Sequence, residues 1–164
     1  MKIKGTTKTK GFTIIEVVLV LAIAGLIFMM VFIALPALQK SQRDTQRKND
    51  LSRIMTQITT YSSSNRGLIP TDLSFVKNYL GGPSTTTGVA GADYLDPSTG
   101  TGYVIFLSAS PGTTIGGIGY YKASKCGVDG AVINNSASTP VNARNFALTM
   151  VLESQASLYC VDNQ

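Results

Sequence analysis

Residues 9–20 read TKGFTIIEVVLV and open the longest apolar stretch of the chain. From Phe12 to Leu38 the one charged residue is Glu16, so residues 17–38 form 22 uncharged positions in a row. A helix that crosses the hydrocarbon of a bilayer needs about 20 residues. The apolar side chains surround the helix axis instead of forming one stripe, which is typical of a helix in lipid or packed on all sides. The sequence therefore predicts such a helix, and its single carboxylate requires an explanation.

The helical pattern continues beyond the apolar stretch. The tract SQRDTQRKND (41–50) contains no Gly, no Pro and no apolar residue, so it permits a helix but has no evident core to face. Apolar residues then return at the spacing of one helical face, at Leu51, Ile54, Met55, Ile58 and Tyr61. We expect one long helix over residues 12–65, with an apolar first half and an amphipathic second half.

Two residues in the apolar half disfavour a helix. Gly25 costs about 1 kcal/mol relative to alanine, and Pro36 costs about 3 kcal/mol in a helix interior. We expect any melted or kinked stretch to lie between these helix-disturbing positions.

Residues 66–164 are rich in Gly, Ser and Thr and read as a small α+β head. A short helix is expected within residues 70–82, with Thr71 as its N-cap and Gly81 as its end. The candidate strands are Tyr103–Ser108, Gly119–Ala123, Ala131–Asn134, Asn145–Leu152 and Ser157–Cys160. Short strands joined by compact loops favour a small antiparallel sheet that packs on the amphipathic half of the long helix. In the fourth strand, alternation places Phe146, Leu148, Met150 and Leu152 on one face.

Composition limits the classes of function. The chain has 164 residues and no histidine, which excludes nucleophiles activated by histidine and the usual imidazole metal ligands. Of 14 Lys and Arg, four lie in the first ten residues, so residues 12–164 hold ten cations against nine Asp and Glu, a net charge of +1. We expect neither an enzyme nor a nucleic-acid-binding protein, since Lys122, Lys125 and Arg144 look like scattered surface charges.

The two cysteines, Cys126 and Cys160, are too few for a zinc site built from cysteine. A disulfide between them is the simplest pairing, and two unpaired buried thiols are the alternative. Such a bond would persist outside a reducing cytosol.

The stretch KGFTIIE (10–16), which follows a basic leader and precedes an apolar helix, resembles the processing signal of type IV pilins and of the secretion-system pseudopilins. The resemblance covers residues 1–65. In that family a prepilin peptidase in the membrane cuts on the cytoplasmic side, here between Gly11 and Phe12, and the new amine of Phe12 is methylated. A residue without a side chain suits a cut that requires extended backbone. The resemblance therefore implies a leader of residues 1–11, an assembly helix of residues 12–65 and a head of residues 66–164.

The same resemblance offers a role for Glu16. A carboxylate in the membrane needs a partner, and cleavage would create one in the amine of Phe12. In the family's filaments the carboxylate of one subunit is understood to pair with the amine of another. The local alternative is that Glu16 is satisfied within its own chain, near the positive start of the helix.

The resemblance implies a structural subunit of a type IV pilus-like filament, which is a homo-oligomer built by a pilus assembly machinery. The chain would be a single-pass inner membrane protein before assembly and extracellular afterwards. The alternatives are a pseudopilin of a type II secretion or competence system and a membrane-anchored extracellular binding module. We expect no cofactor, although Asp93 and Asp96 in the loop DYLDPSTG are weak candidates for calcium ligands.

Overall fold

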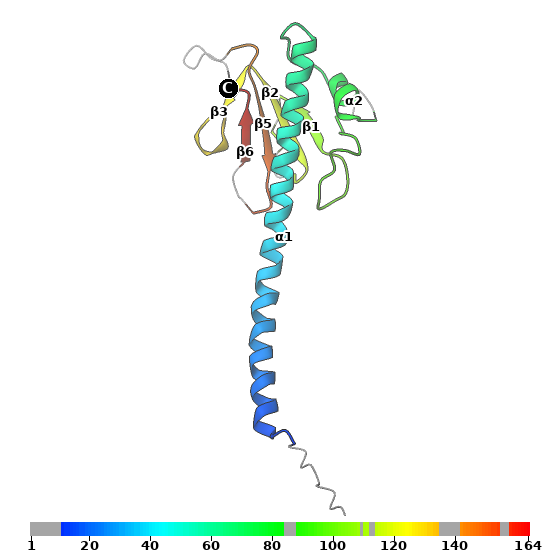
Figure 1. Cartoon of the computed structure of the whole chain (residues 1–164). Coiled ribbons are helices and arrows are strands. Elements are labelled where there is room, and N and C mark those ends of the chain that lie inside the picture. The colour runs from blue at the N-terminus through cyan, green and yellow to red at the C-terminus, as the bar shows by residue number, and fades with distance from the viewer. Residues whose placement is uncertain (1–10, 84–87, 109, 112–113, 135–141, 155–157) are drawn as a thin grey trace, which may run out of the picture. The chain divides into compact units, whose positions relative to one another are not determined.

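The computed structural model describes residues 11–83, 88–108, 110–111, 114–134, 142–154 and 158–164. The chain divides into two units, one that ends at Leu38 and one from Gln39 to Gln164. Each unit contains part of the long helix α1, and every other helix and strand of the described residues belongs to the second unit (Figure 1). We call residues 12–38 the apolar segment and Gln39–Gln164 the globular unit.

Helix α1 extends from Ile14 to Ser64, which confirms a single long helix. Gly25 and Pro36 both lie inside it, and every residue between them is helical. No melted stretch therefore occurs between these two positions, and the helix accommodates Pro36 although proline disfavours a helix interior.

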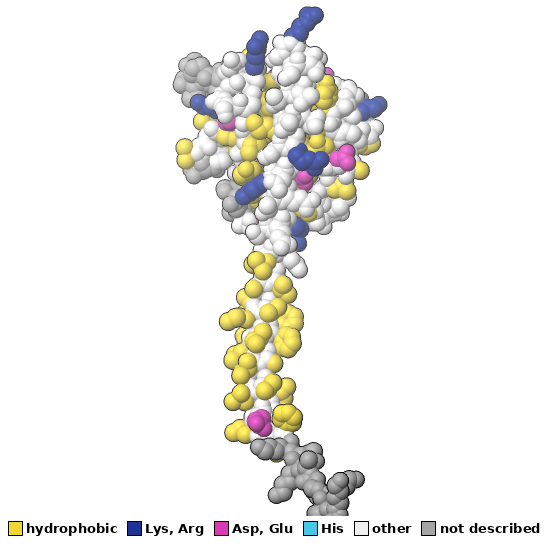
Figure 2. All heavy atoms as spheres, in the orientation of Figure 1, with side chains coloured by type: hydrophobic (Ala, Val, Ile, Leu, Met, Phe, Trp, Pro, Cys, Tyr) yellow, Lys and Arg dark blue, Asp and Glu magenta, His cyan; other side chains and the backbone are white. Residues whose placement is uncertain are grey.

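The two parts of α1 differ in what surrounds their side chains. In the apolar segment the large apolar side chains remain exposed, from 43% for Val31 to 89% for Phe12. They cover the visible side of this part of the helix in Figure 2. In the globular unit, Leu51, Ile54 and Ile58 are fully buried, as the predicted apolar face requires. Within the described residues, the large apolar side chains of the apolar segment are therefore not covered.

Helix α2, Ser74–Leu80, is the short helix expected within residues 70–82. The predicted cap was wrong, because the N-cap position is Leu73 and no side chain caps it. Instead, Asp72 Oδ1 accepts a hydrogen bond from the Ser74 backbone N–H at 2.7 Å. Gly81 ends the helix with φ of 66°, as predicted for a residue in the left-handed conformation.

A four-stranded sheet in the order β1-β2-β5-β6 forms the centre of the globular unit. Strands β2, β5 and β6 pair antiparallel, but β1 pairs with β2 in parallel, which corrects the expectation of a purely antiparallel sheet. In this register Val104 lies opposite Gly117 and Leu107 lies opposite Tyr120, so the connection from β1 to β2 is not a tight hairpin. These strands are β1 Val104–Leu107, β2 Gly117–Lys122, β5 Phe146–Val151 and β6 Leu158–Asp162.

A second, two-stranded sheet pairs β3, Ser124–Cys126, with β4, Val132–Asn134, and a 3-10 turn, η1 Val128–Gly130, connects them. Strand β3 was missed because it has three residues and follows β2 after one turn residue, Ala123, with φ of +47°. Strand β3 contacts β5 and β6.

Strand β5 is buried on both faces. Phe146, Leu148 and Met150 lie in the core as the alternation predicted, but Ala147 and Thr149 on the opposite face are also fully buried. Small side chains on this second face allow other backbone to approach closely. Alternation in the sequence identified one covered face, and tertiary contacts cover the other.

The main core lies between the sheet and the two helices. Leu51, Ile54 and Ile58 of α1 belong to one buried cluster with sheet residues that include Ile118 and Leu148. Three of the aromatic rings in this cluster lie close together, with centroids 5.9 Å apart for Phe75 and Tyr120 and 6.0 Å apart for Tyr120 and Phe146. The buried Tyr120 hydroxyl donates to the Pro70 carbonyl at 3.0 Å, so the core leaves this polar group satisfied.

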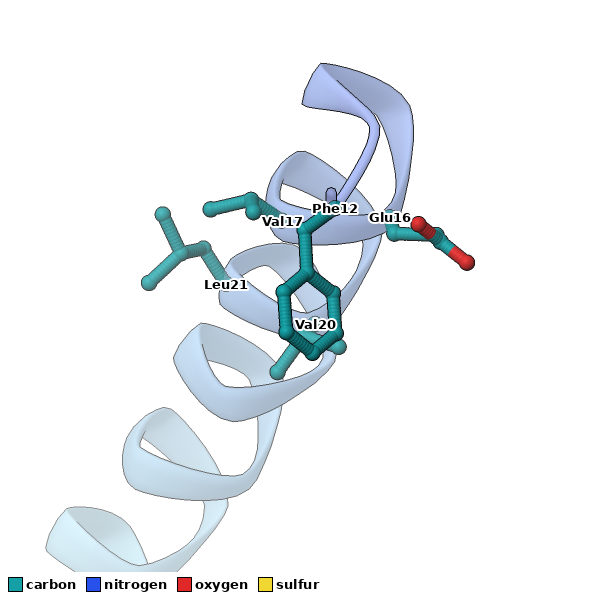
Figure 3. A pocket seen from close by; sticks show the side chains of 5 residues that line it. All are labelled: Phe12, Glu16, Val17, Val20 and Leu21. Carbon is teal, nitrogen blue, oxygen red and sulfur yellow. The ribbon is translucent and has the colours of Figure 1, made fainter. Parts of the chain in front are cut away.

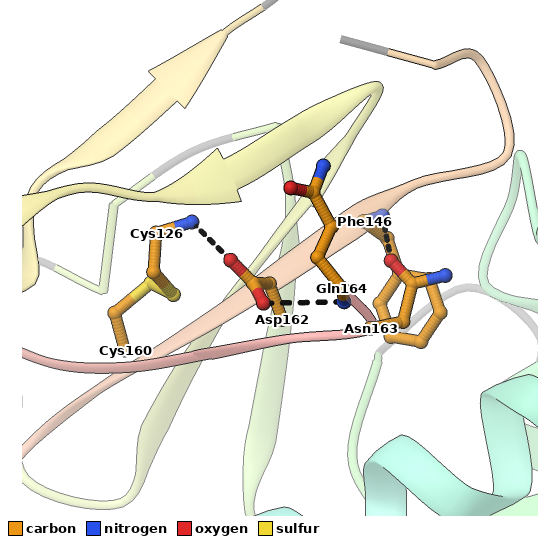
Figure 4. Close-up of a disulfide and its surroundings, with 6 residues drawn as sticks. All are labelled: Cys126, Phe146, Cys160, Asp162, Asn163 and Gln164. Atoms are coloured by element: carbon orange, nitrogen blue, oxygen red, sulfur yellow. Dashed lines mark hydrogen bonds between the residues drawn. A yellow bond between two sulfur atoms is a disulfide. The ribbon is translucent and has the colours of Figure 1, made fainter.

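The structure joins Cys126 and Cys160 in a disulfide, which links β3 to β6 (Figure 4). Beside it, Asp162 Oδ2 accepts a hydrogen bond from the Cys126 backbone N–H at 2.6 Å. Asn163 Oδ1 accepts another from the Phe146 N–H at 2.9 Å. The end of the chain is therefore fastened to both sheets.

Candidate functional site at the start of the apolar helix

Thr13 and Glu16 form a reciprocal set of hydrogen bonds at the first turn of α1. The Thr13 backbone N–H and hydroxyl both donate to Glu16 Oε2, each at 2.9 Å. The Glu16 N–H donates in return to the Thr13 carbonyl at 3.1 Å and to its hydroxyl at 3.4 Å. This arrangement is a capping box, in which an N-cap threonine and a glutamate three residues later satisfy the free N–H groups of a helix start.

Sequence reasoning missed the role of Thr13. The spacing of Thr13 and Glu16 follows the pattern of Ser or Thr, two residues, then Glu or Gln, which marks a helix start. The local alternative for Glu16 is therefore present in the single chain.

The two oxygens of the Glu16 carboxylate differ in their surroundings. Both hydrogen bonds from Thr13 go to Oε2, and within the described residues no hydrogen bond reaches Oε1. The capping box thus leaves one carboxylate oxygen free to accept from another donor.

A shallow apolar groove lies beside this carboxylate. It is lined by Phe12, Glu16, Val17, Val20 and Leu21. In Figure 3 the Phe12 ring lies along the helix over Val20, while the Glu16 carboxylate points sideways, away from Leu21. Among the five side chains that line the groove, the Glu16 carboxylate is therefore the one polar group, and the groove is open to other molecules.

Gly11 is exposed, and a Cβ added to it would meet nothing within 4 Å. The chain itself therefore does not require glycine at this position. A requirement for glycine would have to come from a molecule that binds this backbone.

By length and composition, α1 could cross a membrane with its apolar part, whose mean hydropathy reaches 3.1 over 18 residues. None of that window is buried within the chain.

The globular unit holds a buried ionic cluster that the sequence did not suggest. Arg47 is fully buried, and its guanidinium contacts three carboxylates, at 2.6 Å for Asp96, 2.7 Å for Glu153 and 3.0 Å for Asp44. It also donates to the Ser98 hydroxyl at 2.8 Å. The expectation that residues 41–50 face no core was wrong, because Asp44, Arg47 and Asp50 are buried.

A signal for this cluster was present in the spacing. Asp44 and Arg47 precede Leu51, Ile54 and Ile58 at alternating steps of three and four, so they extend the same helical stripe. Because Asp44 and Arg47 are not apolar, the apolar pattern of this stripe begins only at Leu51.

Two loops are fastened to α1 through this cluster. Asp44 accepts hydrogen bonds from the backbone N–H groups of Glu153, at 2.9 Å, and Ser154, at 2.8 Å, and from the Ser154 hydroxyl. Arg43 makes two further bonds to Glu153, at 2.6 and 3.0 Å. Asp96 holds its own loop through Ser98 and the Thr99 N–H.

The cluster also changes the interpretation of the calcium candidates. Both carboxylate oxygens of Asp96 accept hydrogen bonds from Arg47, at 2.6 and 3.0 Å. The positive partner of this carboxylate is therefore a side chain of the protein itself. The Asp93 side chain is exposed, and its carbonyl accepts from Arg53 at 3.2 Å. No group of three or more metal-ligating side chains lies together in the described part of the chain.

The carboxylates of the cluster have lowered pKa values. Burial alone would raise the pKa of Asp96, but hydrogen bonds from Arg47 and Ser98 outweigh it and lower the pKa from 3.8 to about 2. Burial likewise opposes the bonds from Ser154 and Glu153 that lower the pKa of Asp44. The bonds from Arg43 lower the pKa of Glu153.

Comparisons with family models, with curated proteins and with solved structures found no match for this chain. The resemblance to type IV pilins therefore depends on the sequence of residues 1–65 alone.

We predict that Arg47→Met lowers the free energy of unfolding by about 3–5 kcal/mol, because it leaves buried carboxylates without their cation. Arg43→Met is the control, since Arg43 is 30% exposed and its loss should cost about 1 kcal/mol or less. Urea unfolding of the detergent-solubilised full chain, followed by tyrosine absorbance, measures both values. Equal losses in the two variants would contradict a special role for Arg47.

We also predict a loss of stability in acid. The folded-state pKa of Asp96 is depressed, so its contribution is fully present above pH of about 4 and disappears as pH falls through about 2. The free energy of unfolding should therefore decline over this window, and Asp96→Asn should flatten the decline. A wild-type slope in Asp96→Asn would show that other groups cause the acid sensitivity.

Proposed function

We propose that this chain is a structural subunit of a type IV pilus-like surface filament. A prepilin peptidase cuts it between Gly11 and Phe12, and the apolar helix then carries it from the membrane into the filament. The observation that carries the proposal is an exposed apolar helix with one carboxylate, Glu16, one turn from the site of cleavage. Lipid before assembly and neighbouring helices after it would both keep this surface away from water.

The geometry of Glu16 supports a partner from another subunit. Cleavage would turn Phe12 into a terminal amine and leave the Thr13 N–H in place, so the capping box would persist. Oε2 would then serve the helix start, and Oε1 would remain available for the amine of a neighbouring chain. In apolar surroundings an ion pair of this kind is strong, because little water screens it.

Repetition of this contact extends an assembly without closing it. The carboxylate and the amine belong to different positions of each chain, so each subunit would accept one neighbour and donate to another. The globular units would then form the outer surface, and their loops would be held by the Arg47 cluster.

We predict that the mature chain recovered from sheared surface material begins at an N-methylated Phe12, which mass spectrometry detects. Gly11→Val should remain uncut, because the added side chain obstructs extended backbone in the peptidase. It should fold normally, since nothing lies within 4 Å of its Cβ, and circular dichroism checks this. An intact Met1 on wild-type surface material would overturn the proposal.

Substitutions of Glu16 separate its two roles. Glu16→Gln keeps an acceptor for the capping box but removes the charge, whereas Glu16→Ala removes both. If pairing with an amine drives assembly, both variants should be processed and stable, yet filament yield in electron micrographs should collapse at least about tenfold. If Glu16→Gln gave the wild-type filament yield, the function of Glu16 would be that of a helix cap alone. Asp93→Ala, which removes an exposed carboxylate of the globular unit, is the matched control and should assemble normally.

A further inference from the structure

A basic hollow lies in the globular unit next to the C-terminal end of α1. Its volume is about 510 Å³, within the range of small-molecule sites. Lys122 from the end of β2 and Arg144 from the turn before β5 both line it. The structure thus brings together two of the three cations that appeared scattered in the sequence. The remaining lining residues are Tyr61, Gly67, Leu68, Ile69, Thr71 and Ala143.

These two cations differ from those on the helical face. The described ion pairs and ring contacts engage Arg43, Arg47, Lys48 and Arg53 of α1. In contrast, no ion pair or side-chain hydrogen bond of the described residues engages the Lys122 ammonium or the Arg144 guanidinium, and no acidic residue lines the hollow. The hollow therefore has an unneutralised positive charge. Figure 2 shows several Lys and Arg side chains that extend from the surface of the globular unit.

The Arg144 side chain is exposed and lies close to the backbone of Gly67. A Cβ at Gly67 would lie 3.3 Å from the Arg144 Cζ, and the φ of +81° is one that glycine adopts most easily. Glycine at this position thus leaves room for the guanidinium in the hollow. Next to it, Leu68 keeps 68% of its surface exposed, which gives the hollow an apolar edge.

We propose that this hollow binds an oxyanion, a carboxylate or a phosphate, carried on a sugar-sized body. Arg144 and Lys122 would bind the anion through charge-assisted hydrogen bonds. The hydroxyl-bearing side chains of Tyr61 and Thr71 match the hydroxyl groups of a sugar, and Leu68 matches its C–H surface. The proposal does not depend on filament assembly, since all of these residues belong to the globular unit.

The experiment titrates the full chain, isotopically labelled in detergent, with sodium glucuronate, glucose 6-phosphate and glucose, and follows the methyl signals of Leu68 and Ala143 by NMR. We expect one or both anions to shift these signals, and the anion that binds more tightly identifies the preferred oxyanion. Binding should weaken as the salt concentration rises. Glucose should give no comparable shift. Equal shifts by glucose, or no shift by either anion, would overturn the proposal.

The variants Lys122→Gln and Arg144→Gln should each weaken binding of the effective anion by about tenfold. Lys77→Gln removes an exposed cation of α2 that does not line the hollow, and it should bind like the wild type. Circular dichroism of all three variants checks that the fold is retained. If Lys77→Gln weakened binding as much as the other two, the effect would be one of overall charge and the site would be rejected.

Discussion

One uninterrupted helix has to satisfy two different surroundings, and the other features of the protein follow from this constraint. The part of α1 in the globular unit buries Leu51, Ile54 and Ile58 against the sheet. In the part of the chain that the structure describes, the large apolar side chains of the apolar segment remain exposed. Removal of apolar surface from water is the largest favourable term in folding and association, so the exposure of this segment to water is unfavourable.

Between the apolar segment and the packed part of α1, the buried side chains of the helix are charged instead of apolar. Arg47 carries its charge into the interior, where three carboxylates and a hydroxyl surround it. A buried guanidinium is tolerated when its donors are satisfied, and its planar shape suits several carboxylates at once. The geometry of these bonds is directional, so the cluster determines where two loops lie on the helix. The cluster also explains how a stretch of α1 with polar composition, residues 41–50, can be partly buried.

At the other end of α1, Glu16 has a local task and, in the proposed filament, an intermolecular one. The local task is visible in the single chain, where Oε2 accepts both bonds from Thr13. The intermolecular task belongs to the proposed filament and would use Oε1. Two oxygens of one carboxylate can accept from different donors at the same time. The presence of the capping box therefore does not argue against a partner from another subunit.

The long helix, the apolar face of its second half, the end of α2 at Gly81 and most of the strands could be predicted from the sequence, because they depend on spacing and on residues with strong local preferences. The capping box was also readable at Thr13 and Glu16, although it was overlooked. The parallel pairing of β1 with β2, the covered second face of β5 and the meeting of Lys122 with Arg144 were decided by the tertiary structure alone. The same holds for the burial of Arg47, since its carboxylate partners Asp96 and Glu153 lie 49 and 106 positions away in the chain. Local patterns report which face of an element is apolar, whereas contacts between distant segments depend on the path of the loops, for which the sequence carries no periodic signal.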